Sequence, residues 1–343
     1  MTFKIVRTIE GARLDEKEYL KIADEFVVIP CQTEEEIIAA ARDADVVQTF
    51  LQPFTRRVIG NLQRCRLIQS TGTGYEGIDI QAATDHGICV SYPGDYSRDE
   101  VAEHTIALLL ACARKIPRLD RAVREGKWDS FRKPGIRKLW PSMFRIKGQT
   151  LGLIGFGRIA REVASRVKGL GLMIIAFDPY VTSEIFTEQD VEQVSLEHLL
   201  ENADYISINA ALTKENTHLL GVEEFKKMKT TAYLINTSRA EIVDEKALIV
   251  ALEHGYIAGA ALDVVEGEGE RSIEDPLLPK GHPLLQFENL ILTAHSAFYS
   301  EQSMHELKQR PYDEIVRIRK GQWPKYLLNP HVKENYQKRW GRE

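Results

Sequence analysis

The stretch LGLIGFGRIA at residues 151–160 decides the fold of much of this chain. An apolar run leads directly into the pattern G-x-G-x-x-A, and a segment of helical periodicity follows. Gly155 permits a tight turn, Gly157 lets the backbone approach a pyrophosphate, and Ala160 allows close packing of helix on strand. Phosphates are expected at the N-terminus of this helix, where free N–H groups favour anions. Alone the pattern is weak, because a glycine turn can be purely structural.

An acidic residue supports the nucleotide interpretation. The apolar run at residues 173–177 ends at Asp178, which lies 23 residues after Gly155. A carboxylate there accepts ribose hydroxyls and repels a 2′-phosphate, which predicts NAD rather than NADP. The alternative is a simple turn residue before Pro179. The expected cofactor-binding residues of this unit are Gly155, Phe156, Gly157, Arg158, Ile159 and Asp178.

The rest of the chain alternates short β-branched runs with segments of helical periodicity, which predicts an α/β fold with parallel sheets. Its 343 residues amount to roughly two domains. Residues 33–36 form a capping-box sequence before a helix. The predicted strands lie at residues 4–6, 26–29, 46–48, 67–69, 88–90, 150–154, 173–177, 205–209, 232–236, 259–264 and 290–294.

Composition excludes several classes of protein. The chain has 45 Lys and Arg against 50 Asp and Glu, a net charge of −5. It therefore lacks the basic excess that would indicate nucleic-acid binding. The longest apolar run, residues 106–113, is far too short to span a membrane, and residues 1–7 resemble a first strand rather than a signal peptide. The cysteines lack metal-ligand spacing and predict free thiols in a reducing cytoplasm, with no metal site. They are Cys31, Cys65, Cys89 and Cys112.

Polar groups follow three late strands. Arg239 comes after residues 232–236, Asp263 after residues 259–262, and His295 after residues 290–294. Parallel sheets bind ligands at the carboxyl ends of their strands, so these three side chains predict a site for a carboxylate substrate. Each alone has an ordinary alternative, a surface charge or a hydrogen-bonded histidine. The early glycine loop at residues 72–79 also offers N–H groups to a carboxylate, although a plain turn is the better interpretation by itself.

The region between the two sets of strands is unusual. A helix is predicted from Glu100 to Ile116, ended by Pro117, with apolar residues on more than one face. Residues 118–148 are basic and aromatic, which predicts a dimerisation arm covered by a second subunit. The alternative is a loop folded back on its own domain.

These motifs together resemble the D-isomer-specific 2-hydroxyacid dehydrogenases. The resemblance runs from the loop at residues 72–79 through VAEHT at residues 101–105 and the 155–160 turn to His295. Residues 178–180, 194–200 and 294–302 are most similar to the branch named after the C-terminal-binding proteins.

The resemblance implies two Rossmann-like or flavodoxin-like domains with parallel sheets. The substrate domain is discontinuous, made of residues 1–99 and 298–343, and residues 100–297 form the NAD-binding domain. The partners implied are a small 2-hydroxy or 2-keto acid and a second copy of the chain in a homodimer.

The resemblance also implies roles for individual residues. Arg239 clamps the substrate carboxylate and polarises the C2 oxygen, and His295 is the general acid and base. Glu268, rather than Glu266, orients His295 and raises its pKa. Asp263 contacts the nicotinamide amide. Further residues fall at cofactor positions (Thr105, Thr237, Ser238), substrate positions (Thr73, Gly74, Phe298) and the side-chain pocket (Phe50, Gln52, Tyr75).

Departures from the family pattern leave the catalytic groups in place. They are Ala240, Ala294 and residues 209–213. The function expected is NAD-dependent interconversion of a D-2-hydroxy acid and its 2-keto acid. The alternative is an NAD(H)-sensing, corepressor-like binding protein, which the acidic charge and the short polar tail after Pro330 disfavour. Formate-dehydrogenase-like chemistry is disfavoured because an acid, not a Gln, stands at Glu268.

Overall fold

The computed structural model describes residues 2–10, 16–128, 142–267 and 278–341. The chain divides into two units, each described by itself below. Unit 1 comprises Met1–Tyr96 and Ser300–Glu343, and unit 2 comprises Ser97–Tyr299. The predicted α/β class and the discontinuous first unit are therefore confirmed.

Unit 1 is a five-stranded parallel sheet with strand order β2-β1-β3-β4-β5, the flavodoxin-like order. Alternate residues of each strand face opposite layers. Ile5 lies in the core with α12, whereas Val6 lies in the core with α2, α3 and α4. Its elements are β1 Lys4–Arg7, α1 Glu16–Tyr19, β2 Glu25–Val28, α2 Glu34–Ala41, β3 Val46–Thr49, α3 Arg56–Asn61, β4 Leu67–Ser70, α4 Ile80–Asp85, β5 Cys89–Ser91, α12 Glu301–Arg319 and α13 Lys333–Trp340.

The C-terminal segment belongs to this first sheet. Ile315 and Ile318 of α12 are buried against the strands. The Asn329 side chain accepts the Val90 N–H at 2.9 Å and donates to the Ile88 carbonyl oxygen at 2.9 Å. The two ends of the chain are thus parts of one folded unit.

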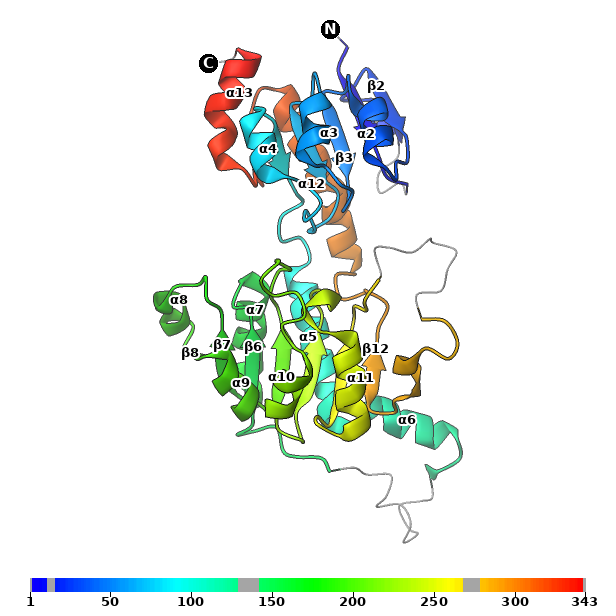
Figure 1. Ribbon diagram of the computed structural model, residues 1–343, viewed down its shortest axis with the longest axis vertical. Helices are drawn as coiled ribbons and strands as arrows, with labels where there is room; N and C mark the ends of the chain where they lie inside the picture. The colour runs from blue at the N-terminus through cyan, green and yellow to red at the C-terminus, as the bar shows by residue number, and fades with distance from the viewer. Residues whose placement is uncertain (1, 11–15, 129–141, 268–277, 342–343) are drawn as a thin grey trace. The chain divides into compact units, whose positions relative to one another are not determined.

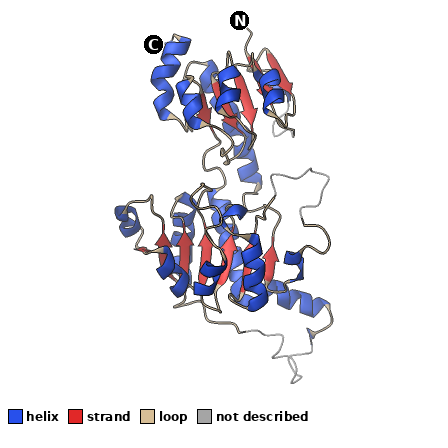
Figure 2. Cartoon of the chain, viewed as in Figure 1, coloured by secondary structure: helices blue, strands red, loops and turns tan. Residues whose placement is uncertain are grey.

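Unit 2 is a seven-stranded parallel sheet with strand order β12-β11-β10-β9-β6-β7-β8. The order reverses between β6 and β9, the switch point at which such sheets bind dinucleotides. Helices α9, α10 and α11 cover one face, and α5, α7 and α8 cover the other (Figures 1 and 2). Its strands are β6 Thr150–Ile154, β7 Met173–Phe177, β8 Glu192–Gln193, β9 Tyr205–Ile208, β10 Tyr233–Asn236, β11 Gly259–Leu262 and β12 Leu290–Leu292. Its helices are α5 Arg98–Arg114, α6 Ile116–Arg124, α7 Arg158–Val167, α8 Ser183–Glu188, α9 Leu196–Asn202, α10 Val222–Lys227 and α11 Glu245–His254.

The predicted end of the long helix is wrong. Helix α5 ends at Arg114, Lys115 takes a left-handed conformation with φ 54°, and α6 begins at Ile116 with Pro117 in its first turn. Proline lacks an N–H, which the first turn of a helix does not use, so Pro117 starts a helix rather than stopping one. The first part of the predicted arm is therefore helical, and residues 129–141 lie outside the described residues.

Three observations concern the class of protein. All four cysteines are free thiols, as predicted, and all four are buried. Within the described ranges, no helix is long and apolar enough to cross a membrane, and no group of three or more potential metal ligands occurs.

Candidate active site

The glycine turn between β6 and α7 has the geometry that a dinucleotide requires. Gly155 has φ +85°, and a Cβ there would lie 2.7 Å from the backbone of Ala210. A Cβ at Gly157 would meet no atom within 4 Å, so open space lies beside the N-terminus of α7. A pyrophosphate can occupy such a space and accept from the first N–H groups of the helix.

The Asp178 carboxylate is fixed at the end of β7, beside this turn. It accepts the N–H of Phe156 at 2.8 Å and the N–H of Tyr180 at 2.9 Å. Both bonds orient an acceptor at the position expected for an adenosine ribose. Phe156 contributes only this backbone group, because its ring is fully buried and stacks on Phe186. Arg158 is exposed at the start of α7, and Ile159 is partly buried.

The loop after β10 is shaped by a buried asparagine. The Asn236 amide donates to the Arg239 carbonyl oxygen at 2.9 Å and accepts the Ser238 N–H at 3.0 Å. Ser238 in turn donates through Oγ to the Ala210 carbonyl oxygen. Arg239 is partly buried, and its Nη1 donates to the Ser238 carbonyl oxygen at 3.0 Å. The turn thereby brings Ser238 and Arg239 to the carboxyl edge of the sheet.

Asp263 organises the loop that carries His295. Its carboxylate is buried and accepts from the Thr293 hydroxyl at 2.5 Å, the Ser296 N–H at 3.0 Å and the Ala297 N–H at 2.9 Å. The His295 N–H donates to the Asp263 carbonyl oxygen at 2.9 Å. The backbone of His295 is left-handed, with φ 46°, a conformation that a histidine keeps only where its surroundings hold it. Asp263 and His295, both predicted to follow strand ends, therefore lie in one hydrogen-bonded network.

Helix α5 adds side chains to the same edge. The Thr105 and Thr237 hydroxyls are 2.7 Å apart. The His104 Nε2 lies 3.0 Å from the Thr293 Oγ1 and 3.5 Å from Asp263 Oδ1. Because the Thr293 hydroxyl donates to Asp263, its oxygen is left to accept from His104 Nε2–H. The sequence around His104 predicts no role for it, apart from its place beside Thr105.

Two acidic residues, Glu266 and Glu268, follow β11. Glu266 Oε1 lies 3.0 Å from His218 Nε2 and 3.4 Å from the backbone nitrogen of Glu245, so it belongs to the loop before α11. Glu268 lies outside the described residues. Phe298 lies edge-on to the His295 ring, with centroids 6.1 Å apart.

In unit 1, the glycine loop after β4 is built around Ser70. Its hydroxyl contacts the carbonyl oxygens of Gly72 and Gly74 at 2.9 and 2.7 Å. Thr73 is exposed, and the Phe50 ring covers Gly72 closely enough to exclude any Cβ there.

Gln52 and Tyr75 have different surroundings. Gln52 donates to the Thr8 carbonyl oxygen at 2.9 Å and accepts from Thr49 at 2.9 Å, so its amide braces the loop. Its place in a substrate pocket stays a prediction. Tyr75 is partly exposed and lies edge-on to Tyr92.

Comparison with known proteins identifies what this arrangement resembles. The family model "D-isomer specific 2-hydroxyacid dehydrogenase, NAD binding domain" matches residues 106–297. A glyoxylate reductase of Korarchaeum cryptofilum is 36% identical over 301 residues, which cover 86% of each chain. A D-3-phosphoglycerate dehydrogenase of Methanocaldococcus jannaschii is 35% identical over 92% of this chain and 57% of its own length.

A solved structure extends the likeness to both units. The D-lactate dehydrogenase of Aquifex aeolicus, complexed with NAD and lactic acid, aligns with a TM-score of 0.78 and 25% identity. The alignment covers 95% of this chain and 98% of that one. These relatives carry names other than that of the C-terminal-binding proteins, so the assignment to that branch stays a prediction.

Proposed function

Because this chain belongs to the D-isomer specific 2-hydroxyacid dehydrogenase family, we propose that it reduces a short 2-keto acid of the glyoxylate class. It is an NAD-dependent enzyme that interconverts 2-hydroxy and 2-keto acids. The choice of substrate is supported by the glyoxylate reductases among its relatives. One observation carries the catalytic assignment. His295 stands on the loop held by Asp263, at the same sheet edge as Arg239 and the glycine turn.

The residues present fit NAD. The space beside Gly157 suits a pyrophosphate, and Asp178 presents an acceptor to a ribose and a negative charge against a 2′-phosphate. The Thr105–Thr237 pair, Ser238 and Asp263 lie at the strand ends where a nicotinamide would reach. Bound NADH supplies the hydride for reduction of the keto acid.

We assign the proton and charge chemistry to two side chains. Arg239 pairs with the substrate carboxylate and stabilises negative charge on the C2 oxygen. His295 donates a proton to that oxygen during reduction and takes it back during oxidation. Glu268 is expected to stabilise the protonated His295, a role that stays a prediction.

Unit 1 offers a second group for carboxylate binding. No acceptor among the described residues takes the N–H groups of Thr73 or Gly74. Consecutive N–H groups of this kind bind anions without a charged side chain. These N–H groups therefore support the prediction that Thr73 and Gly74 contact the substrate carboxylate.

The test is a panel of keto acids monitored by NADH consumption, with glyoxylate, hydroxypyruvate, pyruvate, branched-chain keto acids and phenylpyruvate. Glyoxylate or hydroxypyruvate is expected to give the highest kcat/KM. His295→Ala should lower turnover by at least ~10²-fold while NADH binding persists. His198→Ala, which changes an exposed histidine of α9, is the control. Tight NADH binding without turnover on any acid would favour the NAD(H)-sensing alternative instead.

The homodimer is a further proposal, supported by exposed apolar residues on α6. Ile116 and Val123 are 56% and 42% exposed, and Trp128 just beyond the helix is 72% exposed. Such residues are typical of a subunit interface. Light scattering of the wild type and of Ile116→Glu/Val123→Glu tests it, because a monomer in both samples contradicts the proposal.

We also propose a cytoplasmic enzyme with no nucleic-acid partner. The four buried free thiols suit a reducing compartment, and the net charge of −5 disfavours phosphate backbones. Fractionation of cells that express the chain checks the location.

A further inference from the structure

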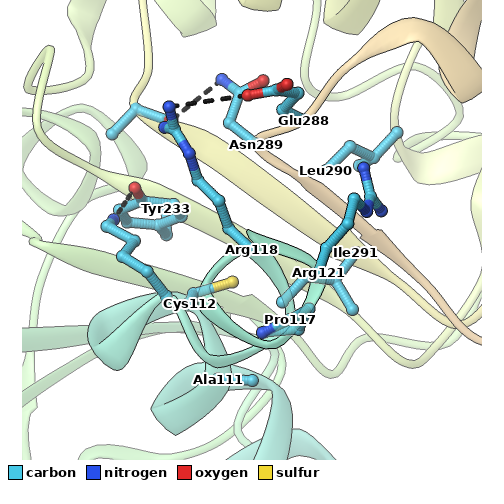
Figure 3. Close-up of a pocket in the computed structure, with 12 residues that line it drawn as sticks. Ala111, Cys112, Pro117, Arg118, Arg121, Tyr233, Glu288, Asn289, Leu290 and Ile291 are labelled. Carbon is cyan, nitrogen blue, oxygen red and sulfur yellow. Dashed lines mark hydrogen bonds and ion pairs between the residues drawn. The ribbon is translucent and has the colours of Figure 1, made fainter. Parts of the chain in front are cut away.

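A cavity lies at the edge of the unit 2 sheet where the strands begin, opposite the edge that carries His295. It is lined by the C-terminal end of α5, the start of α6, the first residues of β10 and β12 and the residue before β11, and its volume is about 70 Å³ (Figure 3). One water needs only ~10–15 Å³ of such space, so a small organic molecule fits. We call it the amino-edge cavity, and its polar side chains come mainly from Lys115, Arg118, Arg121 and Tyr233.

Two of the three positive charges of this cavity, those of Lys115 and Arg121, have no carboxylate partner among the residues that the structure describes. Lys115 is 8% exposed, and its Nζ contacts the Tyr233 hydroxyl and lies 3.8 Å from the centroid of that ring. Arg118 has an ion pair with the exposed Glu288 at 3.5 Å. Over the residues that the structure describes, no carboxylate lies within 4 Å of the charged nitrogens of Lys115 or Arg121. Buried charges are ordinarily paired, so this cluster leaves room for an anion.

The backbone supports a specific role for Lys115. Its left-handed φ of 54° at the junction of α5 and α6 turns the chain, and its side chain lines the cavity. Non-glycine residues in this conformation concentrate at ligand sites. Burial lowers the pKa of the Lys115 amine to about 8, and the positive charge of Arg118 acts in the same direction. A bound anion would offset both effects.

The walls define the chemistry of the ligand. Pro117, Leu290 and Ile291 provide apolar surface, which suits a short hydrocarbon group. The Tyr233 hydroxyl offers a hydrogen bond beside the Lys115 ammonium. Glu288 at the same cavity disfavours a second carboxylate in the ligand.

We propose that the amino-edge cavity is a binding site for a small organic monocarboxylate of two to four carbons, held by Lys115 and Arg121. The site is separate from the candidate active site, since the strands that begin at this cavity end at Arg239, Asp263 and His295. A ligand bound there stabilises the folded protein without occupying the candidate active site.

The test uses sodium acetate as the probe and sodium chloride at equal ionic strength as the reference, without nucleotide. Acetate is expected to raise Tm above the chloride reference and to give a binding isotherm by calorimetry. Lys115→Met should weaken acetate binding at least ~10-fold, because it removes the buried charge. Lys127→Met removes the same charge just beyond α6, from a residue paired with Glu125, and should bind acetate as the wild type does.

A second pair of variants keeps the proposal falsifiable if Lys115→Met does not fold. Arg121→Met changes an exposed residue and should weaken acetate binding severalfold. Arg239→Met should leave acetate binding intact. Loss of binding in Arg239→Met with full retention in Arg121→Met would place acetate at the active site and overturn the proposal. An absence of any acetate-specific effect in the wild type would overturn it as well.

Discussion

Asp263 fixes the backbone of His295 from both sides of the residue. Its carbonyl oxygen accepts the His295 N–H at 2.9 Å, and its carboxylate accepts the N–H groups of Ser296 and Ala297. The resemblance implied only a contact between Asp263 and the nicotinamide amide. The structure adds that the same buried carboxylate holds the loop of His295, whose backbone is left-handed.

Asp263→Asn is expected to lower kcat ~10–100-fold, because its amide N–H₂ replaces an acceptor and releases the loop of His295. The free energy of unfolding should fall by ~1–3 kcal/mol, the cost of a buried donor left without an acceptor. Steady-state kinetics and urea unfolding measure the two effects. Asp190→Asn, at an exposed carboxylate, is the control. Unchanged kcat in Asp263→Asn would contradict the positioning role.

His104 is expected to act through Thr293 and Asp263 on the same loop. His104→Ala should lower kcat ~10-fold with a smaller change in the KM for the keto acid, because the substrate groups themselves remain. His104→Gln keeps a side-chain N–H donor and should recover much of the activity. The pH profile of kcat distinguishes this role from simple packing. An equal loss in both variants would indicate packing alone.

Asp178→Asn is expected to weaken NADH binding ~10-fold, since a hydrogen bond to a charged acceptor is lost. NADPH binding should improve relative to NADH, because the charge that repels a 2′-phosphate is gone. Fluorescence titration with each nucleotide measures both. Glu184→Gln on the neighbouring helix α8 removes an exposed charge and should alter neither affinity. A ratio of NADH to NADPH affinity that stays constant in Asp178→Asn would count against the ribose contact.

Lys115 predicts a pH dependence of stability. The pKa of its amine is about 8 in the folded chain and near 10.5 when unfolded, so between these values the unfolded state binds more protons. The contribution of Lys115 to the free energy of unfolding is therefore unfavourable at pH 7 and improves as the pH rises from 8 to 10.5. Urea unfolding of the wild type and Lys115→Met across this range should show the wild type gaining stability relative to the variant as the pH rises. A constant difference would mean that the amine is not perturbed.

Local patterns predicted most of the fold. The strands are short β-branched runs, and the G-x-G turn and the capping box of Thr33 and Glu36 depend on neighbours in sequence. The end of α5 was missed because proline is read equally well as the end of one helix or the start of another. Strand β8 is not among the predicted strands, because its two residues are too few to form a recognisable sequence pattern.

Candidate site residues could be predicted where they directly follow a strand, but not where their role depends on a contact with a residue far away in the sequence. Arg239, Asp263 and His295 each follow a strand, so their common edge could be inferred. The contact of His104 with Thr293 joins positions 189 residues apart, and no periodicity reports such a pair. The Gln52 amide likewise holds the loop around Thr8, a contact that only side-chain packing reveals.

The attachment of the C-terminal segment has a consequence for aggregation. Strand β5 is an outer strand of its sheet, and outer strands expose N–H and C=O groups that recruit other chains. Asn329 accepts the Val90 N–H, and Leu328 donates to the Val90 carbonyl oxygen at 2.8 Å, so the exposed side of β5 is already occupied. The C-terminal segment of unit 1 thus blocks the free edge of β5, so that this strand cannot pair with a strand of another molecule.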